Sequence, residues 1–177
     1  APESSESLRC EIGKCYKDEE FFEKINLIKK YSKSVKLYFI FGLPAEEQRD
    51  LDGIISFINK SRKIIRTKSS FNPFVPKPHT PFEDYVFNFP ELKEKMKYIN
   101  KNIKDARIED LKSAFIQYVI SLGGSDTGKF IIDSVENNKN LTYSSFSKAI
   151  EKGEIFVPSK EKEWKRIGVS VLFSPTV

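Results

Sequence analysis

The chain has 177 residues, of which 39% are hydrophobic and 31% charged, and its formal net charge is +5. This length supports a domain with its own core, and the composition argues against an intrinsically disordered chain. No apolar run approaches the roughly 20 residues that a membrane-spanning helix needs, and no secretory signal peptide is recognisable, so we expect a cytoplasmic protein without a membrane partner.

The first 75 residues predict helices and strands in alternation. A short helix capped by Ser4 or Ser5 is followed by a second helix with Asp18 as its N-cap. Residues 35–41 alternate and then become apolar throughout, which is typical of a strand buried on both faces. An amphipathic helix and a second strand at about 64–74 follow. Helices between strands indicate right-handed βαβ units and a parallel sheet, which needs more strands than these two.

The second half of the chain is mainly helical by the same criteria. Pro90 opens a lysine-rich helix, since proline is favoured in the first helical turn. Asp126 and Thr142 are the expected N-caps of two shorter helices further on. The tail at 166–177 ends in a predicted strand.

The two cysteines, Cys10 and Cys15, are five residues apart. This spacing matches no common metal motif, and two cysteines in a chain of this length do not make a disulfide framework of the secreted kind. We expect two buried or incidental thiols.

The stretch FNPFVPKPHTPFEDY, residues 71–85, contains four prolines, three phenylalanines and the single histidine of the chain. Proline fixes its own φ and cannot donate a backbone hydrogen bond, so this stretch is neither a helix nor a central strand. We expect a stiff, extended exit from the strand before it, with aromatic rings along its length.

Ligands in parallel α/β folds lie outside the carboxyl ends of the strands, and the segment Phe41–Gly42–Leu43–Pro44 follows the first predicted strand. Gly42 would let a ligand approach the backbone, and the backbone groups of Phe41 and Leu43 could bind a flat polar ring such as adenine. The alternative is a plain strand-ending turn with Pro44 at the start of the next helix.

Three phrases in this order, APESSESLRCEIGK, KLYFIFGLPAEE and NPFVPKPHTPF, resemble the second half of radical S-adenosylmethionine (radical SAM) Fe–S oxidoreductases, some of which carry an upstream cobalamin-type domain. Related tRNA methylthiotransferases have a similar layout. The resemblance covers roughly residues 1–85. It implies the second half of a partial (β/α)6 TIM-like barrel, with Ala1 at the end of the fourth strand, residues 35–41 as the fifth and about 64–74 as the sixth. Residues 86–177 would form a helical C-terminal extension with a terminal strand.

The resemblance also implies roles for individual residues. Glu3 and Lys14 would hold the ribose and methionyl groups of SAM, which suits a carboxylate and an ammonium. Phe41, Gly42, Leu43 and Pro44 would meet the adenine. Phe74 and Val75 would close the other side of the pocket. Lys77 and His79 would line the substrate wall, although a histidine in such a rim can equally brace Asp84.

The chain departs from the family pattern at Ser5 and Ala45, where glycine is usual. The cluster motif Cys-x3-Cys-x2-Cys is absent, and Cys10 and Cys15 have the wrong number and spacing to replace it. Three thiolates are needed to hold a [4Fe-4S] cluster that leaves one iron for SAM. The resemblance therefore implies that the chain is a piece of an enzyme whose cluster ligands lie elsewhere. The piece would be inactive alone, and its partner would be the missing half of its own barrel.

Two further hypotheses stay open at this point. The basic charge is compatible with a non-enzymatic module that binds RNA or another anionic partner. An isolated half-barrel would also leave an open sheet edge, so we expect the isolated chain to form a homodimer through that edge.

Overall fold

The computed structural model describes residues 2–157 of the chain. These residues form two compact units, and the chain passes between them repeatedly. The first unit contains residues 2–72 and 91–108, and the second contains 73–90 and 109–157. Among residues 2–157, no helix is long and apolar enough to cross a membrane.

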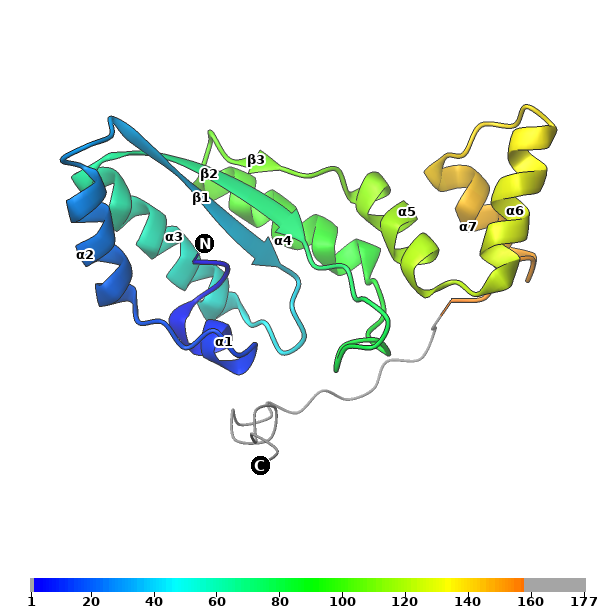
Figure 1. Cartoon of the computed structure of the whole chain (residues 1–177), viewed down its shortest axis with the longest axis horizontal. Coiled ribbons are helices and arrows are strands. Elements are labelled where there is room, and N and C mark those ends of the chain that lie inside the picture. The colour runs from blue at the N-terminus through cyan, green and yellow to red at the C-terminus, as the bar shows by residue number, and fades with distance from the viewer. Residues whose placement is uncertain (1, 158–177) are drawn as a thin grey trace. The chain divides into compact units, whose positions relative to one another are not determined.

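The first unit is a small sheet with helices packed around it (Figure 1). Its helices and strands, in chain order, are α1 (Glu6–Glu11), α2 (Asp18–Ile28), β1 (Ser34–Phe41), α3 (Gln48–Ile64), β2 (Arg66–Pro73), α4 (Phe89–Asn102) and β3 (Arg107–Ile108), of which β2 and α4 run into residues of the second unit. The sheet has the strand order β1-β2-β3, and the arrows of β1 and β2 point the same way in Figure 1. β2 pairs with β3 in parallel, with Ser70 opposite Arg107.

Aromatic rings make the core of the first unit. Phe39 of β1 stacks on Phe71 of β2 with ring centroids 5.2 Å apart, and both side chains are buried. Phe57 of α3 contacts Phe39 from one side and stacks on Phe22 of α2 at 4.8 Å from the other. The helices α2 and α3 are thereby fixed to the same part of the sheet, because each contributes a ring to one contiguous cluster.

β1 differs from the sequence-based prediction in its burial. Leu37, Phe39 and Phe41 are buried, but Lys36 is exposed and Tyr38 is 47% exposed. The strand is therefore buried on one face along most of its length, and the prediction of burial on both faces is wrong.

The prediction of the second half of a partial (β/α)6 barrel is also wrong. The described residues form one three-stranded sheet, in which β3 has two residues, among seven helices, and the fold is a mixed α/β fold. After β2 the chain continues through the proline-rich segment and α4 to the two-residue strand β3, and the sheet of the described residues ends there with three strands. A pattern in the sequence gives the order of elements, but the number of strands in a sheet depends on which segments pair.

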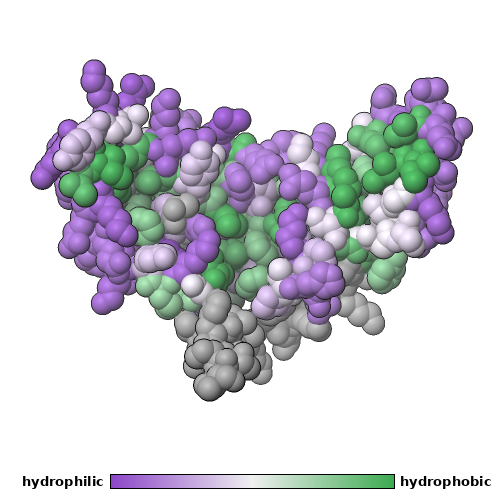
Figure 2. Space-filling view, viewed as in Figure 1, coloured by the Kyte–Doolittle hydropathy of each residue, from purple (hydrophilic) through white to green (hydrophobic). Residues whose placement is uncertain are grey.

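The second unit contains α5 (Leu111–Leu122), α6 (Ser125–Glu136) and α7 (Tyr143–Glu151). Its core is a cluster of rings in which Phe115 contacts Phe87 and Tyr143, and Phe146 is fully buried against Phe130. The surface of α6 is partly apolar, since Ile132 and Val135 are more than half exposed. Figure 2 shows hydrophobic residues gathered over α6 and α7, at the right of the view, whereas hydrophilic residues cover much of the remaining visible face.

The helix starts test the predicted caps. Ser5 and Thr142 act as N-caps, and their hydroxyls accept from the backbone N–H groups of Leu8 and Ser145. Asp18 is instead the first helical residue after Lys17, and Gly124, not Asp126, precedes α6. The predicted strand within 166–177 and the placement of Ala1 at a strand end lie outside the described residues.

Candidate functional site

The N-terminal segment lies against β1 and places Glu3 beside the sheet. The backbone N–H of Glu3 donates to the carbonyl of Tyr38 at 3.1 Å, and the N–H of Ile40 donates to the carbonyl of Glu3 at 2.7 Å. Glu3 thus forms a parallel bridge with Phe39. The bridge fixes the backbone of Glu3, so its carboxylate projects from a defined point next to the strand.

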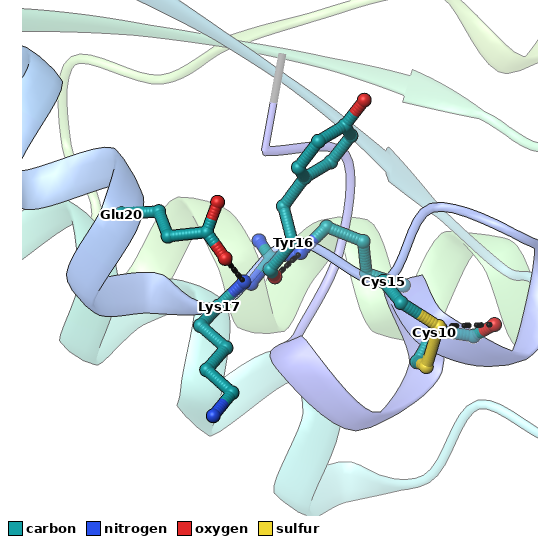
Figure 3. Close-up of a disulfide and its surroundings, with 6 residues drawn as sticks. Cys10, Cys15, Tyr16, Lys17 and Glu20 are labelled. Carbon is teal, nitrogen blue, oxygen red and sulfur yellow. Dashed lines mark hydrogen bonds between the residues drawn. A yellow bond between two sulfur atoms is a disulfide. The ribbon is translucent and has the colours of Figure 1, made fainter.

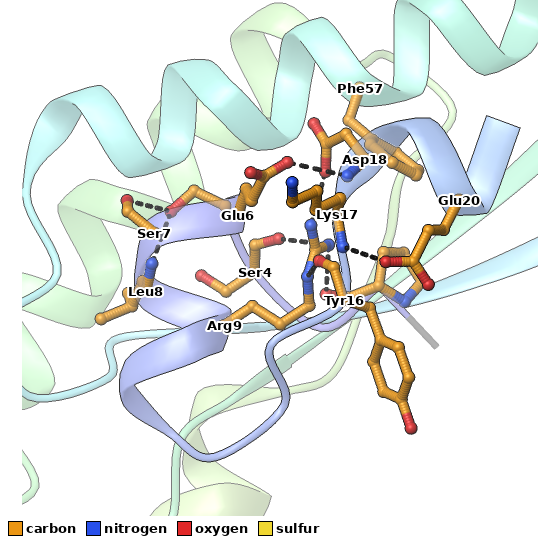
Figure 4. Close-up of polar contacts among 12 residues, drawn as sticks. Ser4, Glu6, Ser7, Leu8, Arg9, Tyr16, Lys17, Asp18, Glu20 and Phe57 are labelled. Atoms are coloured by element: carbon orange, nitrogen blue, oxygen red, sulfur yellow. Dashed lines mark hydrogen bonds and ion pairs between the residues drawn. The ribbon is translucent and has the colours of Figure 1, made fainter. Parts of the chain in front are cut away.

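Arg9 of α1 ties three segments together from a fully buried position (Figure 4). Its Nη1 donates to the carbonyl of Pro2 at 3.0 Å, and its Nε donates to the carbonyl of Tyr16 at 2.9 Å. Its Nη2 pairs with Asp18 Oδ1 at 2.5 Å. A guanidinium has five donors in a rigid plane, so one side chain holds the N-terminal segment, the loop after α1 and the start of α2 in a fixed relation.

The loop after α1 carries Lys14 and begins with a Schellman motif, the common C-terminal cap of a helix. The N–H of Gly13 donates to the carbonyl of Cys10, and the N–H of Lys14 donates to the carbonyl of Arg9, both at 3.0 Å. Gly13 has φ of +82°, in the left-handed region where glycine is unstrained. The motif turns the chain back, so Lys14 points toward the N-terminal segment.

Glu3 and Lys14 meet as an ion pair. Lys14 Nζ lies 2.5 Å from Glu3 Oε1, with side-chain exposed fractions of 51% for Lys14 and 15% for Glu3. The other oxygen of Glu3, Oε2, is buried and has no hydrogen-bond partner among residues 2–157. An unpaired buried carboxylate oxygen is costly, so the site has one acceptor that a bound donor would satisfy.

A cavity of about 400 Å³ opens at this ion pair. It is lined by Glu3, Gly13, Lys14, Cys15 and Tyr16. Four of these five lining residues are exposed, so the cavity is an open hollow at the surface. A carboxylate, an ammonium and an aromatic ring at one cavity suit a ligand that carries both a carboxylate and a hydroxyl or amine.

The cysteines differ from the sequence-based prediction. Cys10 and Cys15 form a disulfide (Figure 3), and neither is a buried thiol: Cys15 is exposed and Cys10 half-buried. The prediction of two buried or incidental thiols is therefore wrong. The reason is the Schellman turn, which brings Cys15 back over the last turn of α1.

The segment Phe41–Pro44 at the end of β1 is buried throughout. Gly42 has φ of +80°, and a Cβ added to it would lie 2.1 Å from Leu92 Cδ2 of α4. The space that the glycine leaves is therefore filled by a side chain of the protein itself. This segment therefore ends β1 and also packs against α4 through Leu92.

A second pair, Glu46 with Lys95, was not singled out from the sequence. Glu46 Oε1 accepts from the N–H of Gly42 at 2.9 Å and lies 3.1 Å from Lys95 Nζ, which also contacts Glu91 at 2.8 Å. The side chain of Glu46 is fully buried, and its Oε2 has no partner among the described residues. The glutamate directly after the strand-ending turn, in the phrase GLPAEE, was the signal that could have indicated this role.

The electrostatics of this pair follow from its burial. Desolvation raises the pKa of Glu46, and attraction to Lys95 and the hydrogen bond from Gly42 offset only part of that rise. Burial alone would lower the pKa of Lys95, but the carboxylates of Glu46 and Glu91 outweigh it and raise that pKa. The pair anchors α4 to the turn at Gly42.

The remaining predicted residues belong to the second unit. Phe74 contacts Phe82 and Tyr85 with ring centroids 5.5 and 5.7 Å away, and Val75 beside it is half-buried. Lys77 Nζ donates to Ser121 Oγ at 2.8 Å. His79 is exposed with φ of +60°, and its backbone N–H donates to Glu83 Oε2 at 2.8 Å. The structure thus brings Glu3 and Lys14 together, and it assigns these four residues to a different unit.

No group of three or more His, Cys, Asp or Glu side chains among residues 2–157 is arranged to hold a metal ion. With both cysteines of the chain in one disulfide, the residues present do not fit a [4Fe-4S] cluster.

Comparison with known proteins gives relatives without an assigned activity. No protein-family model matches the chain, and no solved structure matches it. The chain is 37% identical over 138 residues to the uncharacterized protein MJ0966 of Methanocaldococcus jannaschii, an alignment that covers 74% of this chain and 31% of that protein. It is 26% identical over 107 residues to the uncharacterized protein MJ1620 of the same organism, covering 58% of this chain and 21% of that protein. The chain therefore spans a third or less of the length of these curated relatives.

Proposed function

We propose that this chain is part of a radical SAM enzyme and contributes part of its SAM pocket. The observation that carries the proposal is the contact between Glu3 and Lys14 at a cavity of about 400 Å³. The family resemblance gives these two residues the SAM-binding role, and they are 11 residues apart in the sequence. Their meeting at one cavity supports a shared ligand.

The chemistry of SAM suits this pair. SAM carries an amino-acid carboxylate, an ammonium and ribose hydroxyls. The carboxylate would accept from Lys14 Nζ, and a hydroxyl or the ammonium would donate to Glu3, whose Oε2 has no partner among the described residues. Arg9 holds the segments that carry both side chains, so it acts as a positioning residue.

The chain alone would bind SAM without cleaving it. When bound, a [4Fe-4S] cluster supplies the electron that cleaves SAM, but its thiolate ligands would have to come from elsewhere in the parent protein. The reaction of that parent, any cobalamin in it, and the substrate-wall roles of Lys77 and His79 remain predictions from the resemblance.

Isothermal titration calorimetry of the chain with SAM tests the proposal. We expect saturable binding that weakens by about tenfold or more in Lys14→Met and Glu3→Gln, because a hydrogen bond to a charged group is worth about 1.5–3 kcal/mol. Lys30→Met is the matched control, since Lys30 is also exposed and does not line the cavity. No SAM binding by the wild-type chain, or unchanged binding by both variants, would contradict the proposal.

The reading frame upstream of Ala1 gives an independent test. We expect an in-frame Cys-x3-Cys-x2-Cys roughly 100–200 residues earlier, the span of the first part of such a domain. If it is absent and the chain binds RNA with a steep salt dependence, the basic binding module is the better description.

A further inference from the structure

We propose that Cys10 and Cys15 form a reversible thiol–disulfide switch that controls how firmly Lys14 is held at the Glu3 cavity. The proposal concerns the loop at 13–16, which lines that cavity. Its effect on SAM rests on the proposed function, but its effect on the loop does not.

The bridge is poorly suited to a purely structural role. A disulfide stabilises a fold mainly by closing a long loop of the unfolded chain, and this one joins residues separated by five positions. It is also accessible, since Cys15 is exposed. Exposed disulfides are the labile and regulatory ones, whereas structural bridges resist reduction.

The disulfide restrains the backbone of Lys14, because Cys15 is the next residue in the chain. The backbone N–H of Lys14 donates to the carbonyl of Arg9 at 3.0 Å. The carbonyl of Tyr16 accepts from Arg9 Nε at 2.9 Å. The backbone of Lys14 is thus held by the disulfide at the next residue and by hydrogen bonds, since its carbonyl also accepts from the N–H of Tyr16 at 2.7 Å. Reduction removes the covalent restraint and leaves the hydrogen bonds, so the loop stays attached while the backbone of Lys14 gains freedom.

The chemical step is thiol–disulfide exchange with an external thiol. A thiolate attacks the Sγ of Cys15, the more exposed of the two residues, forms a mixed disulfide and expels the thiolate of Cys10. A second external thiolate attacks the external sulfur of that mixed disulfide and releases the thiolate of Cys15. Two external thiols are oxidised to one disulfide, two electrons reduce the protein bridge, and the two protons end on Cys10 and Cys15.

The disulfide form should bind the ligand more tightly, because a site that is already ordered loses less conformational freedom on binding. We expect the disulfide form to bind about tenfold more tightly than the dithiol form, which is within the usual range for coupled sites. The linkage is reciprocal, so SAM should shift the reduction equilibrium of the bridge by the same factor, which corresponds to about 30 mV for a two-electron couple.

The first experiment measures the loop without any ligand. Hydrogen exchange is followed by mass spectrometry in the oxidised chain, in the chain reduced with dithiothreitol, and in Cys10→Ser/Cys15→Ser. We expect the amides of Gly13, Lys14 and Tyr16 to exchange faster in the reduced chain and in the double variant, while β1 and α3 stay unchanged. Equal exchange of the loop in the oxidised and reduced chains would overturn the proposal.

The second experiment adds SAM to the same three samples. The fraction of dithiol is measured by alkylation and intact mass in dithiothreitol redox buffers, with and without SAM, and calorimetry gives the affinity of each form. We expect SAM to favour the disulfide, and the double variant to bind like the reduced chain under all redox conditions. Equal affinity for both redox forms would overturn the switch, whereas a redox-dependent loop that binds no SAM in either form would reject the proposed function and leave the loop switch standing.

Discussion

At the scale of single residues, Lys95 is the side chain whose replacement we expect to be most informative. In Lys95→Met, the buried carboxylate of Glu46 loses its cation, which should cost about 3 kcal/mol of unfolding free energy at neutral pH. Urea denaturation measures this loss. Lys97→Met is the control, because Lys97 and its partner Glu94 are both exposed and the change should stay within about 0.5 kcal/mol.

The pH dependence of that variant has a defined sign. The pKa of Glu46 is raised in the folded state, so its contribution to stability is complete below the unfolded value of 4.5 and is lost as the pH rises through the folded pKa. Removing Lys95 raises the folded pKa further. The loss of unfolding free energy in Lys95→Met should therefore be small at a pH of about 4 and reach its full value at a pH of about 8. A deficit that is the same at both values would mean that Glu46 does not cause it.

At the scale of elements, the turn after β1 depends on Gly42. Gly42→Ala should destabilise the chain by about 2 kcal/mol, because alanine is strained at a φ of +80° and its Cβ would overlap Leu92 of α4. Gly128→Ala is the control with the opposite sign, since that glycine is helical with nothing within 4 Å of an added Cβ. It should stabilise by about 0.5–1 kcal/mol. Equal unfolding midpoints in urea for the two variants would contradict this account.

The elements themselves were largely predictable, because the patterns that specify them are local. Hydrophobic patterns predict β1 and α3, and a second strand after α3 is confirmed as β2. Thr142 is confirmed as a cap, and of the two alternatives Ser4 and Ser5 the cap is Ser5. The prediction of a barrel was wrong because strand pairing is not local. The sequence of β2 does not indicate that its neighbour in the sheet, β3, has two residues.

The site was predictable only in part. The resemblance to a family pointed to Glu3 and Lys14, while Arg9 was missed because an arginine in a short helix gives no sign that it is buried. The disulfide was missed because a spacing of five carries no information until Gly13 is recognised as the left-handed residue that turns the chain. The available signal was the spacing around the C-cap Ile12: Cys10 lies two residues before it and Gly13 directly after it.

At the scale of the whole molecule, we expect the isolated chain to dimerise through β1. This strand lies at one end of the strand order, and Tyr38 and Ile40 use their outward backbone groups to bond Glu3. Because strands alternate with a period of two residues, the backbone of Lys36 faces the same open edge. Lys36→Pro should abolish the dimer without unfolding the chain, since proline is tolerated on edge strands. Light scattering gives the mass, and a monomeric wild type would contradict the prediction.

The repeated passage of the chain between the two units has a consequence for synthesis on the ribosome. Leu92 and Ile99 of α4 complete the core of the first unit, but they are made only after the proline-rich segment of the second unit. The residues of β1 and β2 therefore leave the ribosome before the helix that carries Leu92 and Ile99. During that interval their apolar surface is exposed, and at the 5–20 residues per second of translation it lasts on the order of seconds. A nascent chain stalled with β1 and β2 outside the ribosome and α4 still inside it should thus be a better target for chaperones than a chain stalled before β1 or the finished chain.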